Sequence, residues 1–437
     1  MQTSLETLGQ LERRLNVAVP LTAIESEVAK RLAKLAKNVK VPGFRPGKVP
    51  MKMVAQQYGP QVRSDVISDT VQATFNNAIR DQNLRIAGYP RIEPKAAAPG
   101  GEDQLEFSAV FEVYPEIRIG DLSAVTITRP VAEVGPADIA DTIEVLRKQR
   151  ATFAPAGRPA AHGDRVMVDF SGRIDGVEFQ GGQAKDFAIN IGEGRMLPEF
   201  EAAVTGMQAG ESKVFRLTFP ADYHGKDVAG KEAEFTLQAL SVSVPVLPEV
   251  DAEFARAFGV ASGDVEELKA EIADNLRLEL KRKIEAKVKE QALAALRQKA
   301  EFAVPRSLVE AEAQNMARRM AAELQQQGMK PEDMKLGPEL FRASAEDRVA
   351  LGLALGEVVR AHALEAKPEQ VKALVQEAAQ TYEQPDAVVR WHYEKAERLN
   401  EFEALAVERN VVDWVLTRAR VEDAATTFAE LMSPARG

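Results

Sequence analysis

A ten-residue stretch at positions 41–50, VPGFRPGKVP, sets one phenylalanine and two cations among three prolines and two glycines. From Lys30 to Lys52 the chain carries eight Lys or Arg residues and no acid, although its formal net charge is −10. Most lysine-rich helix faces are simply solvated. Phe44, however, stands where a loop tip should be polar, and the prolines and glycines lower the entropy lost on binding. The stretch therefore predicts a contact loop for a large anionic partner. Ribonucleoprotein fits better than free DNA, because no base-reading set accompanies the loop.

A second group of residues that could act together is aromatic and lies in the middle of the chain. Three of its rings belong to segments whose apolar residues alternate as in half-buried strands: Phe170, Phe187 and Phe235. Phe200 falls on the one short helix that fits there, at 198–205, and Tyr223 lies in a polar loop. These rings could simply be core, as we expect for Phe215 and Phe219. Phe200 and Tyr223 lie near loops and suit a cleft better.

An aromatic cleft can carry out chemistry without a nucleophile. Rotation about an X–Pro bond has a barrier of roughly 18–20 kcal/mol, because resonance makes the amide partly double-bonded. A dry aromatic site favours the less polar twisted amide, and a well-placed donor can hold the preceding carbonyl. The hydroxyl of Tyr223 could be that donor.

The region that must position the 41–50 loop mixes strands and helices. Alternating apolar residues predict half-buried strands near both ends of residues 1–113. Thr22-x-x-Glu25 resembles a capping box that opens a helix. A second helix is predicted from about 50 to 82, so the loop would lie at the tip of a helix–loop–helix.

The rest of the chain changes character twice. Residues 151–245 read as an antiparallel sheet wrapped around a short helix, and residues 114–150 as a linker with a helix. From 246 to 437 the pattern is almost wholly helical, with an apolar stripe from Val265 to Val288 and prolines between successive helices. Long helices with few bulky anchors suggest an all-α, elongated region. We therefore expect a multidomain α+β protein.

Composition excludes several classes of protein. The chain has no cysteine, and its four histidines are not at metal-ligand spacing, which disfavours disulfides and metal sites. The segment GKDVAGKE at 225–232 has phosphate-loop spacing but ends in Glu232, so no nucleotide site or other cofactor is expected. The N-terminus lacks an apolar signal segment, and the most apolar stretch, at 349–359, is too short to span a bilayer. A cytoplasmic protein without a membrane partner is expected.

The segment GFRPGKVP resembles the GFRxGKxP signature of bacterial trigger factor, a family of ribosome-associated chaperones. The resemblance extends over the whole chain. It implies that 1–113 binds the ribosome near the peptide exit tunnel, contacting ribosomal protein and rRNA. The residues that match the motif are Gly43, Phe44, Arg45, Gly47 and Lys48. Pro46 replaces a basic residue frequent in the family, so docking should depend less on salt.

The middle region resembles the FKBP-type peptidyl-prolyl isomerase fold through VDFSG, GVEFQGG, DFAINIG, RMLPEFE, FPADYHG and AEFTLQAL. Carried over, the resemblance implies a catalytic pocket formed by Phe170, Phe179, Phe187, Met196, Leu197, Phe200, Tyr223 and Phe235. Two positions depart from the family pattern. Gln180 stands where many members have an acid, and Glu199 replaces the usual glycine before the helix aromatic, so the isomerase rate could be reduced.

The combined interpretation is an ATP-independent chaperone that binds unfolded nascent chains through the helices of 246–437 and isomerises prolyl bonds through 151–245. When the chain is not bound to the ribosome, a second copy of the chain is a further candidate partner. Two alternatives stay open. One is a free cytosolic prolyl isomerase whose helices only tether or dimerise it. The other is an RNA-binding module with a vestigial isomerase domain.

Overall fold

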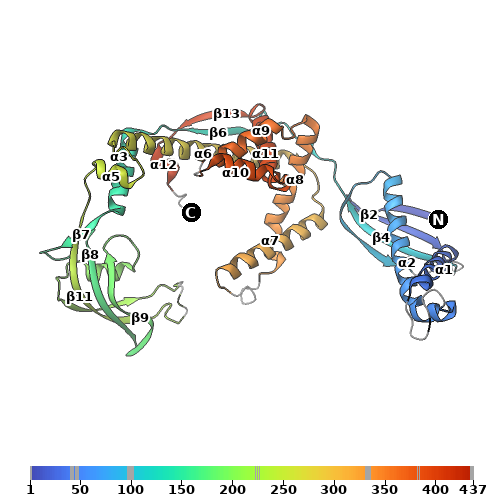
Figure 1. The fold of residues 1–437 in the computed structure, drawn as a ribbon, viewed down its shortest axis with the longest axis horizontal. Helices are drawn as coiled ribbons and strands as arrows, with labels where there is room; N and C mark the ends of the chain where they lie inside the picture. Colours follow the sequence, from blue (N-terminus) through green and yellow to red (C-terminus); the bar gives the residue numbers. More distant parts are fainter. Residues whose placement is uncertain are drawn as a thin grey trace. The chain divides into compact units, whose positions relative to one another are not determined.

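The computed structural model describes residues 2–39, 44, 49–95, 103–221, 223, 225, 227–329, 336–380, 382 and 384–433. The chain forms two compact units. One unit combines Met1–Arg129 with Ala286–Asp423, and the other combines Pro130–Glu285 with Ala424–Gly437. Both units contain helices and antiparallel sheet, so the predicted multidomain α+β class is confirmed (Figure 1).

The first unit begins with a four-stranded antiparallel sheet in the order β1-β2-β4-β3. Its strands are β1 (Gln2–Thr7), β2 (Glu12–Pro20), β3 (Ile86–Pro94) and β4 (Gln104–Val113). Two helices lie between β2 and β3: α1 (Leu21–Asn38) and α2 (Met51–Asp81). Figure 1 shows α2 across one face of this sheet, where Val66 and Phe75 are buried against Leu15, Val17 and Phe111. The alternating strands and the second helix are as predicted.

The predicted capping box at Thr22 and Glu25 is wrong. Helix α1 begins one residue earlier than Thr22, at Leu21; its N-cap is Pro20, which makes no side-chain cap hydrogen bond. Strand β2 runs directly into the helix, because its last residue, Pro20, is still paired with Gln104 of β4. The amide of Leu21 donates to the carbonyl of Asp103 instead, at 2.8 Å.

The second unit holds a five-stranded antiparallel sheet in the order β10-β11-β8-β9, with β7 paired to β11. Its strands are β7 (Thr152–Pro155), β8 (Arg165–Ile174), β9 (Val177–Asn190), β10 (Ser212–Thr218) and β11 (Glu232–Val246). The short helix α4 (Pro198–Val204) packs on the concave core with Phe200, Ala203 and Val204 buried. The predicted sheet around one short helix is confirmed, and α4 ends one residue before its predicted end.

The remaining elements are mostly helical. They include β5 (Arg118–Ile119), β6 (Thr126–Val131), α3 (Pro136–Gln149), α5 (Ala252–Ala257), α6 (Val265–Lys299), β12 (Ala300–Glu301) and α7 (Arg306–Gln326). Further along lie η2 (Pro338–Phe341), α8 (Arg342–His362), α9 (Pro368–Ala379), α10 (Pro385–Tyr393), η3 (Ala396–Arg398), α11 (Asn400–Leu416), β13 (Arg420–Ala425) and α12 (Phe428–Met432). The C-terminal region is helical as predicted, but it is not all-α: β12 pairs with β5 and β13 with β6. These pairings link segments far apart in the sequence, which local periodicity does not reveal.

Candidate functional site

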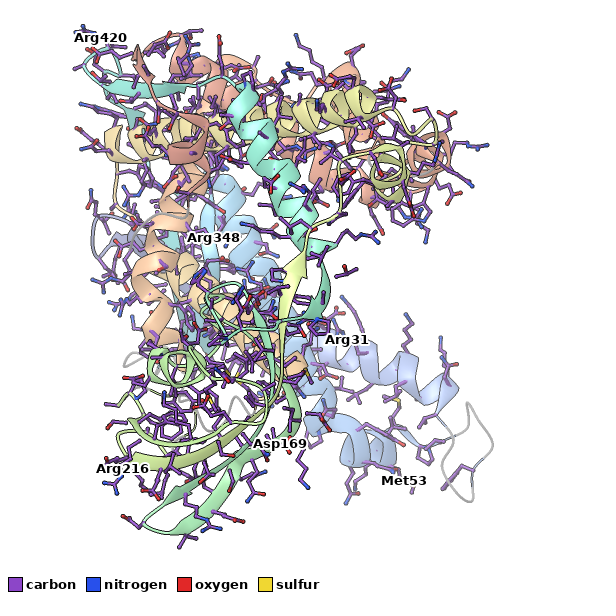
Figure 2. All side chains as sticks on the ribbon, turned by 90° about the vertical axis from the view of Figure 1, so that its left-hand side faces the viewer. Arg31, Met53, Asp169, Arg216, Arg348 and Arg420 are labelled. Atoms are coloured by element: carbon purple, nitrogen blue, oxygen red, sulfur yellow. The ribbon has the colours of Figure 1, made fainter. Side chains whose placement is uncertain are left out.

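The helices that carry the 41–50 loop form a packed hairpin. Leu32 and Ala36 of α1 are buried against Val49 and Val54, the latter on α2. An ion pair between Arg31 Nη1 and Asp69 Oδ2, at 2.7 Å, adds a link between the helices. Figure 2 labels Arg31 on α1 and Met53 on α2. The two predicted helices are therefore present, and they pack against each other through apolar contacts next to the residues that connect them.

Of the five predicted contact residues of the loop, only Phe44 belongs to the described part of the chain. Its side chain is 39% exposed, which is high for a phenylalanine. The other four lie outside the described residues: Gly43, Arg45, Gly47 and Lys48. Met51 and Met53, at the start of α2, are 46% and 41% exposed. These two side chains are not among the predicted contact residues, although their place at a helix start beside a basic loop indicates a possible contact surface.

The aromatic residues of the middle region surround a cavity of about 610 Å³. A cavity of this size accommodates a small ligand or a few residues of a peptide. Seven of the eight residues predicted for the pocket line it: Phe170, Phe179, Met196, Leu197, Phe200, Tyr223 and Phe235. These seven residues come from strands β8, β9 and β11, from helix α4 and from two loops. The fold thus brings together side chains that are spread over residues 170–235.

The rings of the cavity pack mainly edge to face, which is the favoured geometry for aromatic pairs. Phe200 lies between two other rings of the cavity, with ring centroids 5.3 Å from Phe170 and 5.5 Å from Phe235. Phe179 meets Phe235 at 6.0 Å, and Phe219 meets Tyr223 at 4.8 Å. The interlocked rings give the cavity an apolar floor whose shape is fixed by packing.

Two aromatic residues are placed differently from their prediction. Phe187 is 39% exposed and does not line the cavity; its ring packs edge-on against Phe170, at 5.7 Å. Strands β8 and β9 change register beside it, between Val168 and Phe170. Phe219, expected only in the core, is buried and also lines the cavity. It comes directly after β10, where a ring can serve the core and the cavity wall together.

A glycine makes room for one of the cavity rings. Gly172 lies near the end of β8, opposite Phe235 on β11. A Cβ at position 172 would lie 2.5 Å from Cε1 and 2.7 Å from Cζ of Phe235. The ring therefore crosses over the strand at a place that only a glycine leaves open. This explains why the VDFSG segment ends in a glycine.

Polar side chains occur in the lining of the cavity and in the interior of the same domain. Gln180, Arg195 and Asp227 are among the lining residues. Elsewhere in the same domain, Asp164 is almost fully buried and accepts hydrogen bonds from Arg158, at 2.6 and 3.1 Å, and from the amide of Ala161, at 2.8 Å. Burial alone raises the pKa of Asp164, but the hydrogen bonds outweigh it and hold the pKa below its ordinary value.

Within the part of the chain that the structure describes, no group of three or more His, Asp or Glu side chains could hold a metal ion. Among the same residues, no helix is both long enough and apolar enough to span a bilayer.

The sheet wrapped around α4, with its aromatic cavity, defines an FKBP-type domain. Residues 156–240 match the family model of FKBP-type peptidyl-prolyl cis-trans isomerase. Residues 1–146 match the model of bacterial trigger factor protein, and residues 264–417 match the model of its C-terminus.

Curated relatives extend this likeness to the full chain. Trigger factor of Aromatoleum aromaticum and that of Thiobacillus denitrificans are each 52% identical over 435 residues, covering 100% of both chains. Trigger factor of Azoarcus sp. is 50% identical over 438 residues with the same coverage. The chain therefore belongs to the trigger factor family of chaperones and carries an FKBP-type domain.

Proposed function

We propose that the aromatic cavity catalyses cis–trans isomerisation of prolyl bonds in unfolded client chains. The observation that carries this proposal is the cavity of about 610 Å³ floored by Phe170, Phe200 and Phe235. Such a site takes up a proline ring and removes water from the neighbouring amide. The twisted amide of the transition state is less polar than the planar one, so an apolar environment lowers the barrier to rotation. No nucleophile or cofactor is needed.

A proline-containing peptide assay on the full chain tests the activity. Wild type should accelerate isomerisation, and Tyr223→Ala should remove most of the acceleration while leaving suppression of aggregation of an unfolded protein intact. Phe200→Ala should do the same, although loss of a buried phenylalanine costs about 3–5 kcal/mol, so its fold must be checked. Phe187→Ala is the matched control, because this ring lies outside the cavity. An inactive wild type would refute the proposal.

We further propose that the 41–50 loop docks the chain on the ribosome near the exit tunnel. Support comes from the exposed ring of Phe44, from the exposed lysines of α1 (Lys30, Lys34 and Lys37), and from the match to the family motif. A rigid hairpin that presents one aromatic ring among cations suits a surface that combines phosphate groups with an apolar niche.

Co-sedimentation with purified ribosomes at low and moderate salt tests this docking. Wild type should pellet with ribosomes, and Phe44→Ala combined with Arg45→Ala should stay in the supernatant. Lys95→Ala, outside the loop, serves as the charge control. If the double variant pellets like wild type, the loop is only a helix connection, and a free prolyl isomerase becomes the better interpretation. Equal binding to naked RNA would favour an RNA-binding module.

The remaining assignments rest on the match to the trigger factor family. We assign 1–113 to ribosome binding, 114–150 to a linker, 151–245 to isomerisation and 246–437 to binding of unfolded nascent chains. Release of clients would be passive, through weak contacts and rapid exchange, since no nucleotide chemistry is proposed. We place the protein in the cytoplasm and propose a homodimer when it is off the ribosome; sedimentation analysis of the free chain tests the dimer.

A further inference from the structure

The carboxylate of Glu201 holds two backbone amides of the turn that leads into the cavity. Glu201 Oε2 accepts from the amide of Gly192 and Oε1 accepts from that of Gly194, both at 3.1 Å. Glu201 lies on α4 directly after Phe200, whose ring lines the cavity. The two oxygens of one carboxylate thus bridge α4 to a separate segment of chain.

That segment forms one side of the cavity. Gly194, Arg195, Met196 and Leu197 are four consecutive lining residues, and they connect the end of β9 to the start of α4. We call residues 192–197 the cavity wall. It contains no regular helix or strand of its own, so few backbone hydrogen bonds fix its shape.

The backbone of the cavity wall needs an external restraint. Gly192 and Gly194 have φ angles of +95° and +66°, a region that glycine enters freely and leaves freely. The ring of His162 fills the space that a Cβ would take at Gly192, which limits the turn from one side only. The bonds to Glu201 restrain it from the other side, and bonds to a charged acceptor are stronger than neutral ones.

We propose that Glu201 is a positioning residue for prolyl isomerisation: its carboxylate holds the cavity wall in the shape that receives the proline ring. This inference rests on the isomerase activity proposed above. Glu201 need not touch the substrate, because it acts through the amides of Gly192 and Gly194. Its loss should loosen Met196 and Leu197 together. A displacement of about 1 Å in a positioning element can cost up to about a hundredfold in rate.

Glu201→Ala and Glu201→Gln in the full chain test the proposal. The amide side chain keeps one acceptor oxygen, so Glu201→Gln should lie between wild type and Glu201→Ala. The expected result for Glu201→Ala is a rise in KM of about tenfold or more, with a smaller change in kcat, because the wall receives the substrate but does not rotate the bond. Amide hydrogen exchange at Gly192 and Gly194 should accelerate in the same order.

Glu211→Gln is the matched control. Its carboxylate accepts from the amide of Gln208 at 2.8 Å in a turn of the same domain, and neither residue lines the cavity. It should leave KM and the exchange of Gly192 and Gly194 unchanged. Wild-type KM in Glu201→Ala, or unchanged exchange at both glycines, would overturn the inference while leaving the isomerase proposal standing.

If the wild type is inactive, the isomerase proposal is refuted, but the positioning role of Glu201 can still be tested. In that case the readouts are amide exchange at Gly192 and Gly194 and the affinity of the cavity for a proline-containing peptide. Faster exchange together with weaker peptide binding in Glu201→Ala supports the positioning role. Unchanged values of either quantity refute it.

Discussion

The carboxylate of Glu112, on strand β4, accepts a hydrogen bond from the backbone amide of Ser307 at 2.7 Å, across 195 positions of sequence. It also accepts from the amide of Arg306 at 3.1 Å. Both amides belong to the first turn of α7, whose N-terminus favours a negative charge. The N-terminal sheet therefore supplies the cap that α7 lacks in its own sequence, since its N-cap residue is Pro305.

Glu112→Ala should loosen the first turn of α7 and its contact with the sheet. Loss of a helix cap costs about 0.5–2 kcal/mol, and this cap also joins two parts of one unit. Amide hydrogen exchange at the start of α7 measures the effect directly, which is preferable to global unfolding in a chain of several domains. Ser307→Ala should have a smaller effect, because the hydrogen bond from the backbone amide of residue 307 to Glu112 remains.

Glu106→Ala is the control for this prediction. It removes a carboxylate from the same face of β4, six positions away, which does not accept from the amides of Arg306 and Ser307. If Glu106→Ala and Glu112→Ala change exchange in α7 equally, the capping role of Glu112 is refuted.

Asp164→Asn should make the FKBP-type domain less stable at neutral pH and remove part of its acid sensitivity. The pKa of Asp164 is lowered in the folded state, so its carboxylate stabilises the fold at pH values above the unfolded pKa of about 3.9. This stability is lost as pH falls through the lower, folded pKa. Breaking a buried charged hydrogen-bond set costs about 1–3 kcal/mol.

Calorimetric unfolding between pH 2 and 7 checks this sign. The difference between wild type and Asp164→Asn should be largest at neutral pH and shrink at the acidic end. Asp175→Asn, on an exposed turn, provides a comparison that should show little change. A difference that grows as pH falls contradicts the assignment.

Gly172→Ala should distort the cavity without disrupting the sheet. The added methyl group would meet the ring of Phe235 at 2.5 Å, and this ring is packed against Phe200 and has little room to move. Overpacking of this kind costs about 1–3 kcal/mol. The expected readout is a lower Tm together with a higher KM for a proline-containing peptide. Gly157→Ala, where no heavy atom lies within 4 Å of the new Cβ, should change neither.

Gln180→Glu should raise the isomerase rate if an acid at this position assists the reaction. Gln180 lines the cavity, so its side chain can reach a bound peptide. The substitution keeps the size of the side chain and adds a charge, so a change in kcat/KM reports on electrostatics. An increase of several-fold that falls away in acid, as the new carboxyl is protonated, is the expected outcome. A rate that stays at the wild-type value across the pH range assigns no role to the charge.

Local patterns in the sequence predicted the main helices and strands and the family. Alternation at Val166, Val168 and Phe170 predicted a strand, and apolar spacing from Val265 to Val288 predicted a long helix; both are local patterns that follow from the geometry of one element. The motif around Phe44 and the aromatic segments of the middle region were sufficient for the family assignment, because they are contiguous in sequence.

Which side chains meet could be seen only in the folded chain. Phe187 and Phe219 both belong to segments of alternating apolar residues, yet Phe187, beside a register change between β8 and β9, lies outside the cavity, whereas Phe219 lines it. The contact of Glu201 with Gly192 and that of Glu112 with Ser307 join segments whose local patterns are independent. From sequence alone, a carboxylate in a helix or strand is predicted to be a solvated charge. Whether a backbone amide lies within hydrogen-bond distance of it depends on the whole fold.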